Sequence, residues 1–299
     1  MTGIRFYYFI ILIVMTISCQ QQQRIEVNFK YDDESKMLLI PVIIDSSTHM
    51  FNFDTGAAGS IIADSNAFGL KINKKDSAII VWSILDKKIP AYYTFPQAHF
   101  ILPLKRKVKF LIEPNMGRSV IGTNIIKQFY WWFDLGKKRL KISNRRFEID
   151  DLEKWLKIPY KYVKGAMTID VVINDSIQMG EYTFDTGAGR NSADHVPVIL
   201  MNELKTSEQG KAIESKINKT NITWTQIIND GFDNNRGGVF VCYDTINILG
   251  HHFYHCAISI QRNDHMNAKD GLKLVTLGFI RQFSQMYLDT RNNTIYLKP

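Results

Sequence analysis

Two seven-residue stretches decide the fold: Phe-Asn-Phe-Asp-Thr-Gly-Ala at residues 51–57 and Tyr-Thr-Phe-Asp-Thr-Gly-Ala at residues 182–188. An apolar, β-branched run precedes each stretch, at residues 38–45 in the first half and 167–174 in the second, and a polar turn follows each run. The pattern therefore predicts, twice, a hairpin that ends in an Asp-Thr-Gly loop. One such triplet is ordinary where a strand runs into a turn, because Asp and Gly suit turn geometry. Two triplets in matched surroundings indicate a duplicated chain.

A second matched block closes each half, at residues 120–142 and 276–297. Both blocks read as the end of a buried strand, a glycine, a short helix and a final hairpin, with Gly122 and Gly278 as the corresponding glycines. Because the order of these features is the same in both halves, we interpret the chain as an internal repeat of one mostly-β unit.

The repeat sets the predicted domain organisation. An N-terminal lobe spans residues 25–149, a charged linker spans residues 150–159, and a C-terminal lobe spans residues 160–299. A short helix is expected after each triplet, near residues 63–70 and near residues 196–204. We expect two mostly-β lobes related by a pseudo-twofold axis, with a cleft between them. Since one chain carries both lobes, we expect a monomer.

A pseudo-twofold axis between the lobes would bring Asp54 and Asp185 face to face. Two like charges a few ångströms apart resist ionising together, so one carboxyl keeps its proton while the other is anionic. The anion can take a proton from a bound water, and the neutral carboxyl can polarise a carbonyl group. Such a pair hydrolyses an amide with no cofactor and no metal.

The ordered set of hairpin, triplet, flap region, hydrophobic-hydrophobic-glycine block and final hairpin resembles the pepsin and retropepsin superfamily. The resemblance spans residues 36–299 and is closest to bacterial retropepsin-like proteins with both lobes in one chain. It implies that the carboxyls form the catalytic pair, the threonines clasp the opposite loop, and the glycines allow close backbone approach. These residues are Asp54, Thr55, Gly56, Asp185, Thr186 and Gly187. Residues 121–122 and 277–278 would support the two loops from behind.

The residue after each triplet is alanine, Ala57 and Ala188, as in retropepsins, whereas pepsin-like chains usually carry Ser or Thr there. A missing hydroxyl removes one donor that would stabilise a carboxylate. We therefore expect carboxyl groups that titrate higher than those of pepsin, and a mildly acidic optimum.

The flap, a hairpin that closes over bound peptide in this superfamily, is expected near residues 82–93. Its aromatic residues Trp82, Tyr92 and Tyr93 either contact substrate or belong to the core. A longer insert in the second half, at residues 205–238, is either a second flap or a disordered loop.

Residues 1–19 are predicted to be a signal peptide. A basic residue precedes an apolar run at residues 6–17 that is too short to span a bilayer comfortably. The serine before Cys19 resembles a bacterial lipoprotein processing site, in which the cysteine becomes the lipidated first residue; ordinary secretion is the alternative. Residues 20–24 would then be a tether, and the folded part would be lipid-anchored in the bacterial cell envelope, facing the periplasm.

Cys242 and Cys256 lie in a run, residues 241–260, that predicts two strands around a turn at Leu249-Gly250. In an oxidising compartment the two cysteines either form a disulfide or pack as buried free thiols, and the sequence leaves both alternatives open.

Charge and motifs argue against other classes of partner. The formal net charge is +8, but the lysines are spread between apolar runs, as is typical of solvated turns and faces. No RNP-like, zinc-finger or phosphate-loop pattern is present, so we expect no nucleic acid partner. His251, His252 and His255 lie in the predicted hairpin and lack the helical zinc-protease pattern, so we expect no metal site.

The main hypothesis is an aspartic endopeptidase that cleaves a peptide or protein substrate with a water activated between the two carboxylates. The alternatives are a catalytically silent relative that binds peptide in the same groove, and an envelope scaffold with no groove function. Arg190, just after the second triplet, keeps these alternatives open. A cation there would either bias the carboxyl pair toward ionisation or recruit an acidic substrate.

Overall fold

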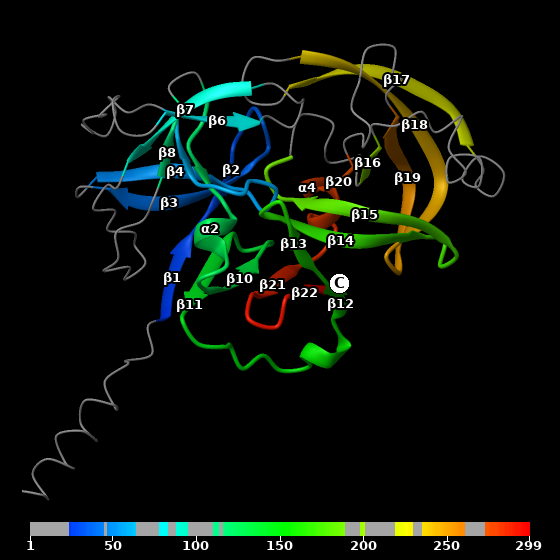
Figure 1. Ribbon diagram of the computed structural model, residues 1–299. Coiled ribbons are helices and arrows are strands. Elements are labelled where there is room, and N and C mark those ends of the chain that lie inside the picture. The colour runs from blue at the N-terminus through cyan, green and yellow to red at the C-terminus, as the bar shows by residue number, and fades with distance from the viewer. Residues whose placement is uncertain are drawn as a thin grey trace, which may run out of the picture.

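The computed structural model describes the central parts of both halves (Figure 1). The described residues are 24–44, 47–63, 78–82, 88–94, 110–113, 116–188, 198–200, 219–229, 235–260 and 273–299. Within these ranges the chain forms three sheets and two short α-helices, α2 (Thr123–Ile126) and α4 (Leu277–Ile280). The mostly-β class predicted from the sequence is confirmed.

The first half forms an eight-stranded sheet with β4 (Ser47–Phe53) near its middle. On one side, β4 is antiparallel to β3 (Leu38–Ile44), and on the other it is parallel to β9 (Val120–Ile121). The outer strands are β2 (Lys30–Tyr31) beside β3 and, beyond β9 in order, β5 (Ile61–Ile62), β8 (Phe110–Ile112), β7 (Lys88–Thr94) and β6 (Ala78–Trp82).

The second half repeats this sheet strand for strand. Its counterpart of β4 is β15 (Ile177–Asp185), antiparallel to β14 (Ala166–Ile173) and parallel to β20 (Lys273–Thr276). The outer strands are β13 (Lys161–Val163) beside β14 and, beyond β20 in order, β16 (Val198–Leu200), β19 (His251–Ile260), β18 (Asn235–Ile248) and β17 (Lys219–Asn229). Order and strand directions match those of the first half, so the predicted duplication is confirmed.

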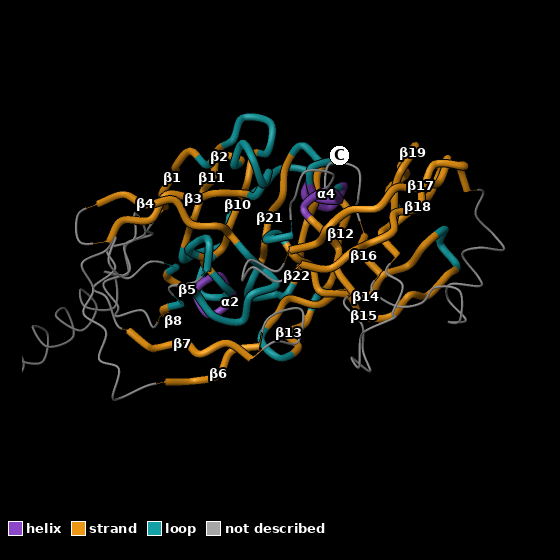
Figure 2. Tube along the Cα trace, turned by 90° about the horizontal axis from the view of Figure 1, so that it is seen from above, coloured by secondary structure: helices purple, strands orange, loops and turns teal. Residues whose placement is uncertain are grey.

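A third, six-stranded sheet joins the halves. Its two central strands, β10 (Tyr130–Asp134) and β21 (Gln285–Asp289), pair antiparallel, one from each half. The outer strands are β11 (Arg139–Ser143) and β1 (Arg24–Asn28) on one side and β22 (Thr294–Lys298) and β12 (Leu156–Pro159) on the other. Figures 1 and 2 both show β10, β21 and β22 between the two eight-stranded sheets.

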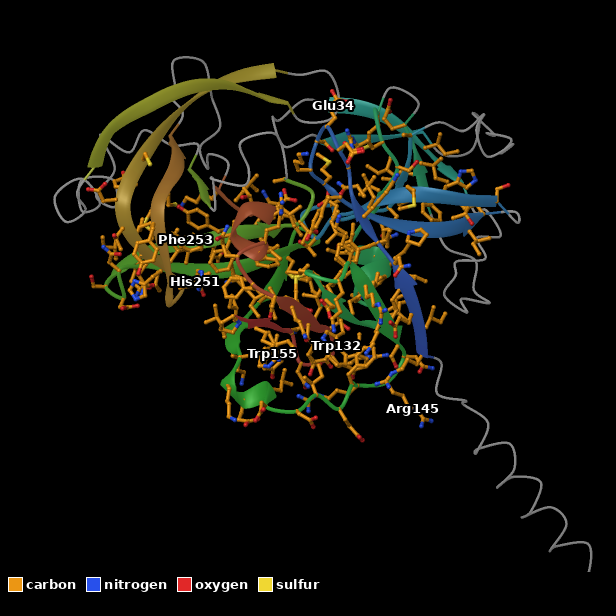
Figure 3. All side chains as sticks on the ribbon, turned by 180° about the vertical axis from the view of Figure 1, so that it is seen from behind. Glu34, Trp132, Arg145, Trp155, His251 and Phe253 are labelled. Atoms are coloured by element: carbon orange, nitrogen blue, oxygen red, sulfur yellow. The ribbon has the colours of Figure 1, made fainter. Side chains whose placement is uncertain are left out.

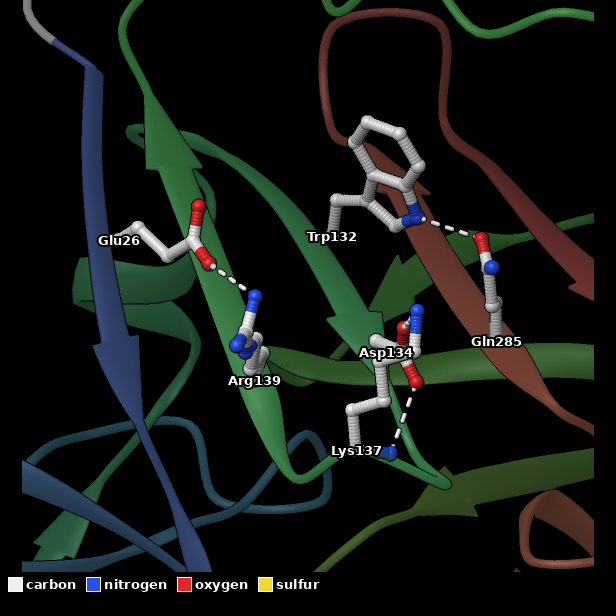
Figure 4. A network of polar contacts seen from close by, with 6 residues as sticks. All are labelled: Glu26, Trp132, Asp134, Lys137, Arg139 and Gln285. Atoms are coloured by element: carbon white, nitrogen blue, oxygen red, sulfur yellow. Dashed lines mark hydrogen bonds and ion pairs between the residues drawn. The ribbon is translucent and has the colours of Figure 1, made fainter.

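Polar contacts on this shared sheet also cross between the halves. The Trp132 indole Nε1 donates to Gln285 Oε1 at 2.9 Å (Figure 4). Along the chain of β10, Trp131 and Phe133 are fully buried in a hydrophobic core that contains residues of both halves. This alternation is typical of a strand that has a different environment on each face.

The opposite face of the shared sheet carries a separate aromatic cluster. Its buried members are Tyr130, Phe147, Trp155, Tyr287 and Tyr296. Phe147 and Trp155 come from the segment between β11 and β12, which packs across this face together with the 3-10 helix at Leu152–Lys154. Figure 3 shows the labelled Trp132 and Trp155 at this end of the molecule.

Two sequence predictions about local structure need correction. The helix expected near residues 196–204 is wrong for Val198–Leu200, which form β16, because both edges of this short β-branched run are paired, with β19 and β20. Within the region expected to be a linker, residues 150–159, four residues form β12, the counterpart of β1 in the shared sheet. The helix expected at 63–70 lies outside the described residues except for Ala63.

Candidate active site

Each Asp-Thr-Gly triplet begins at the end of an inner strand of its own eight-stranded sheet. The Asp54 backbone N–H donates to the Ile121 carbonyl at 3.0 Å, so Asp54 continues the parallel ladder between β4 and β9. Asp185 is the last residue of β15 and pairs with Thr276 of β20. Each carboxyl is thus placed by a central strand with hydrogen-bonded neighbours on both sides, which fixes its backbone.

The two threonines clasp the opposite loops, as predicted. The Thr55 N–H donates to Thr186 Oγ1 at 3.0 Å, and the Thr186 N–H donates to Thr55 Oγ1 at 3.1 Å. Each hydroxyl then donates across the axis to a strand carbonyl: Thr186 Oγ1 to Phe53 O at 2.6 Å, and Thr55 Oγ1 to Phe184 O. Both side chains are fully buried, so these hydrogen bonds hold the two loops together without competition from water.

The glycines of the triplets lie directly against the carboxyl of the other half. A Cβ at Gly187 would lie 2.3 Å from Asp54 Oδ2, and a Cβ at Gly56 would lie 2.7 Å from Asp185 Cγ. No side chain fits at either position without moving a carboxyl group. The predicted close backbone approach is therefore present, and it is reciprocal.

Each carboxyl accepts two backbone hydrogen bonds from its own loop. Asp54 Oδ1 accepts from the N–H groups of Gly56 at 2.8 Å and Ala57 at 2.9 Å. Asp185 Oδ1 accepts from Gly187 at 2.8 Å and Ala188 at 3.0 Å. These donors orient the two carboxyls in the same way in both halves and favour their charged forms.

Burial nevertheless dominates the electrostatics of the pair. Desolvation raises the pKa of Asp54, although its hydrogen bond with Asp185 and the loop amides oppose this. The pKa of Asp185 is raised further, well above its ordinary value, by desolvation, by the charge of Asp54 and by the same mutual hydrogen bond. The two carboxyls therefore titrate as one pair, and together they keep a shared proton to higher pH than an ordinary aspartate would.

The residues that support the two catalytic loops from behind match across the halves in a different way from the sequence prediction. The Thr123 N–H donates to Ala57 O at 2.8 Å, and the Leu277 N–H donates to Ala188 O at 3.1 Å. These equivalent contacts place Thr276, and not Gly278, at the position of Gly122. The pairing of Gly122 with Gly278 was wrong by two residues. An ungapped match of residues 125–129, Ile-Ile-Lys-Gln-Phe, with residues 279–283, Phe-Ile-Arg-Gln-Phe, would have revealed this from the sequence.

One contact between the halves was missed by sequence reasoning. The Thr123 hydroxyl lies within hydrogen-bond distance of the carbonyls of Ala58 and Gly165. Gly165, at a φ of +88°, belongs to the turn between β13 and β14, and a Cβ there would lie 2.6 Å from the Ala58 Cβ. The first residues of β14 also hold the first triplet, since the Met167 N–H donates to Thr55 O at 2.9 Å. A Lys-Gly turn is the only sequence signal at this place.

The flap predicted near residues 82–93 corresponds to the antiparallel pair of β6 and β7 at the edge of the first sheet. Its tip, residues 83–87, and the side chains of Trp82, Tyr92 and Tyr93 lie outside what the structure describes. The counterpart in the second half, β17 and β18, is longer and lies at the edge of the second sheet (Figure 1). Arg190 also lies outside the described residues.

The hairpin predicted around Leu249-Gly250 is confirmed as β18 and β19, and both of its cysteines are buried with no disulfide between them. Cys242 pairs with Ala257 and Cys256 pairs with Tyr243, so the cysteines occupy adjacent rungs of the ladder. Side chains on adjacent rungs leave opposite faces of a sheet, which does not suit the geometry of a disulfide.

Cys19 and the predicted signal peptide lie outside the described residues. No helix in the part of the chain that the structure covers has the length and apolar character needed to cross a bilayer.

Comparison with known proteins supports the fold. The aspartic proteinase from Irpex lacteus is 12% identical, with a TM-score of 0.50 over 92% of this chain and 97% of that one. Basic 7S globulin from soybean is 7% identical, with a TM-score of 0.49 over 93% of this chain and 95% of that one. No family model matches the chain. No curated protein matches it either. The order of the strands and the match to the Irpex lacteus proteinase together show that the chain has the two-lobed fold of pepsin-like aspartic proteinases.

Proposed function

We propose that this protein is an aspartic endopeptidase that hydrolyses peptide bonds between Asp54 and Asp185. The observation that carries the proposal is the reciprocal contact of the two triplets, in which each glycine lies against the carboxyl of the other half. The buried threonine clasp adds that this approach is held from both sides. An arrangement that forces two carboxyls together and raises both pKa values is unfavourable for stability, and such features concentrate at functional sites.

The shared proton gives the two carboxyls different roles in the proposed reaction. The anionic member of the pair takes a proton from a water held between the carboxyls, and the water oxygen bonds to the scissile carbonyl carbon. The neutral member gives its proton to the carbonyl oxygen, which forms a neutral diol. The C–N bond then breaks as the first member passes its proton to the leaving nitrogen, and the second member recovers a proton from the diol.

A peptide library incubated with the full chain between pH 3 and pH 7 tests this function, with products identified by mass spectrometry. We expect Asp54→Asn and Asp185→Asn each to lower kcat/KM by at least about a thousandfold, because each removes one proton carrier. Asp170→Asn, which changes an exposed carboxylate on β14, is the matched control and should leave cleavage intact. Equal cleavage by either dyad variant refutes the proposal. Peptide binding without cleavage by any version would identify the protein as a silent binding relative.

We further propose that the mature protein is anchored by a lipid on Cys19 and faces the periplasm of a bacterial envelope. The support is the sequence pattern, an apolar run that ends in a serine and a cysteine. Cys19→Ala should move the protein from the membrane fraction to the soluble fraction, and it should abolish incorporation of labelled fatty acid. Unchanged membrane association and labelling would contradict the anchor.

A further inference from the structure

We propose that Thr123 is a positioning residue for Asp54, because its buried hydroxyl ties the first catalytic loop to a turn of the second half and so holds the carboxyl in place. The inference rests on the proposed function, since it concerns the same active site. It adds to that site a residue that lies outside both Asp-Thr-Gly triplets.

Thr123 holds the loop residue that orients Asp54. The Ala57 N–H donates to Asp54 Oδ1 at 2.9 Å, and the carbonyl oxygen of Ala57 accepts from the Thr123 N–H at 2.8 Å. Because Ala57 is hydrogen-bonded on both sides, a shift of the loop relative to Thr123 would move a donor of the carboxylate. Thr123 is therefore one residue away from the reacting pair.

The hydroxyl of Thr123 extends this support to the second half. Its Oγ1 lies 2.5 Å from the Gly165 carbonyl oxygen and 3.2 Å from the Ala58 carbonyl oxygen, and a hydroxyl has one hydrogen to donate. The nearer carbonyl, that of Gly165, is the better acceptor. Thr123 is 2% exposed, so water has little access to this hydrogen bond.

The turn that carries Gly165 lies directly against the first loop. Gly165 has a φ of +88°, a conformation that favours glycine, and a Cβ there would lie 2.6 Å from the Ala58 Cβ. Two residues later, the Met167 N–H donates to Thr55 O at 2.9 Å. The second half thus holds the first loop at the triplet and again just after it.

The second half has only part of this arrangement around its own loop. Leu277 takes the place of Thr123, and its N–H donates to Ala188 O at 3.1 Å, so the backbone support is the same. The Leu277 side chain has no hydroxyl and is buried in the main hydrophobic core. The hydroxyl tie therefore belongs to the loop of Asp54.

Loss of this hydroxyl should change the titration of the carboxyl pair. A loop that is no longer tied holds the Ala57 N–H less firmly, and the charged form of Asp54 is then less stabilised. Because the two carboxyls titrate together, this change raises one or both apparent pKa values of the pair and lowers neither. In the described part of the chain, Asp185 is the titratable group that acts on Asp54, and Lys164, the charged residue of the turn, is exposed.

The test compares Thr123→Val, which keeps the shape of the side chain, with Thr123→Ser, which keeps the hydroxyl. We expect Thr123→Val to lower kcat on a cleaved peptide about tenfold with little change in KM, because it displaces a reacting group and not a substrate contact. Its pH–rate profile should move toward higher pH by about half a unit. Thr123→Ser should restore both values.

Thr290→Val is the matched control. Thr290 is also buried, and its hydroxyl donates to the Phe129 carbonyl at 2.6 Å, which is again a contact between the halves but lies next to the shared sheet. This variant should lose melting temperature as Thr123→Val does, yet keep the wild-type kcat and pH profile. The inference is overturned by a wild-type kcat and profile in Thr123→Val, by a failure of Thr123→Ser to restore them, or by an equal profile shift in Thr290→Val.

A measurement without substrate keeps this result distinct from the outcome for the enzyme. Aspartate carboxyl carbons carrying an NMR-active label are titrated in wild type, Thr123→Val and Gly165→Ala, and Asp54→Asn and Asp185→Asn assign the signals. Gly165→Ala forces the turn away from the loop, so it should raise the pKa values of the pair as Thr123→Val does. Raised values support the role of Thr123 even if no peptide is ever cut. Unchanged values with intact cleavage leave the peptidase standing and reject that role.

Discussion

Gly122 and Thr276 occupy the same place in the two halves, each as the residue before a short helix, yet one has no side chain and the other is β-branched. Their backbones are almost the same, with φ of −97° and ψ of −178° at Gly122 and φ of −89° and ψ of 173° at Thr276. Any residue adopts this conformation, so Gly122 is not needed for its backbone freedom. A Cβ there would lie 2.4 Å from the Gly59 carbonyl oxygen, so the requirement is space.

This difference shows that the two halves have the same strand order but pack differently behind the catalytic loops. In the first half the loop after the triplet lies against the residue before the helix, and the Ser60 Oγ accepts from the Gly122 N–H at 2.9 Å. In the second half the Thr276 side chain is accommodated and accepts from the Gly278 N–H at 3.3 Å, as a helix cap. Symmetry is retained at the carboxyls and threonines and relaxed behind them.

Apart from the aspartates themselves, the glycines that touch the carboxyls should give the largest effects on activity. Gly187→Ala and Gly56→Ala should each lower kcat/KM by about a hundredfold or more, because the added Cβ displaces the opposite carboxyl. Gly187→Ala should be the more damaging, since its Cβ would lie 2.3 Å from its neighbour, compared with 2.7 Å at Gly56. Kinetic assays and melting temperatures measure this order. Gly136→Ala, where the nearest atom is 3.8 Å away, is the control and should be nearly silent.

The threonine clasp should show the strongest coupling between the halves. Thr55→Val and Thr186→Val each remove a buried hydroxyl and orphan its partners, at an expected cost of about 2–4 kcal/mol in the free energy of unfolding. Because the two residues share hydrogen bonds, the double variant should cost clearly less than the sum. Denaturant titrations of the four proteins complete the cycle. Strict additivity would mean that the clasp is not one cooperative unit.

Substitutions at Gly122 and Thr276, which support the two loops from behind, should lower stability by different amounts. Gly122→Ala should cost about 1–3 kcal/mol through overpacking against the loop, and activity should fall with it. Thr276→Ala should cost about 1 kcal/mol, the usual loss for a helix cap. Equilibrium unfolding of both variants tests the comparison. Similar small losses of unfolding free energy in both variants would show that the first loop makes room for a side chain as easily as the second.

The smallest effect concerns the dependence of stability on pH. A carboxyl whose folded-state pKa is raised favours the folded state when protonated, so its stabilising contribution is lost as pH rises from its ordinary pKa through the raised one. Asp185→Asn removes that loss and should melt at a higher temperature than wild type at pH 7, with the gap closing toward pH 3. Asp54→Asn should show the same trend, because burial also raises the pKa of Asp54. A difference in melting temperature that does not change with pH would contradict the raised pKa of Asp185.

Sequence reasoning predicted those features that are both local and repeated. The triplets, the hairpins that lead to them and the final hairpins each occur twice with the same residue types, so each copy supports the reading of the other. The clasp of Thr55 and Thr186 followed from the expected twofold axis and the resemblance, and the structure contains it.

Features that depend on distant partners were harder to predict. Val198–Leu200 is too short to show a period, and it is a strand only because β19 and β20 lie on either side of it. Leu156–Pro159 looked like linker, but these residues pair with β22 at the edge of the shared sheet. Asn52 stands between two phenylalanines in β4, and only the structure shows that its buried oxygen lacks a donor among the described residues.

The shared six-stranded sheet has a consequence for how the chain is made. Trp132 on β10 and its partner Gln285 on β21 are 153 residues apart, so β10 has no neighbour on that side until nearly the whole second half has been synthesised. Contacts of such long range slow folding, and an unpaired strand edge invites association with other chains. During synthesis the first half therefore lacks the partner strand that completes its sheet, and this interval is when a holding chaperone would matter most.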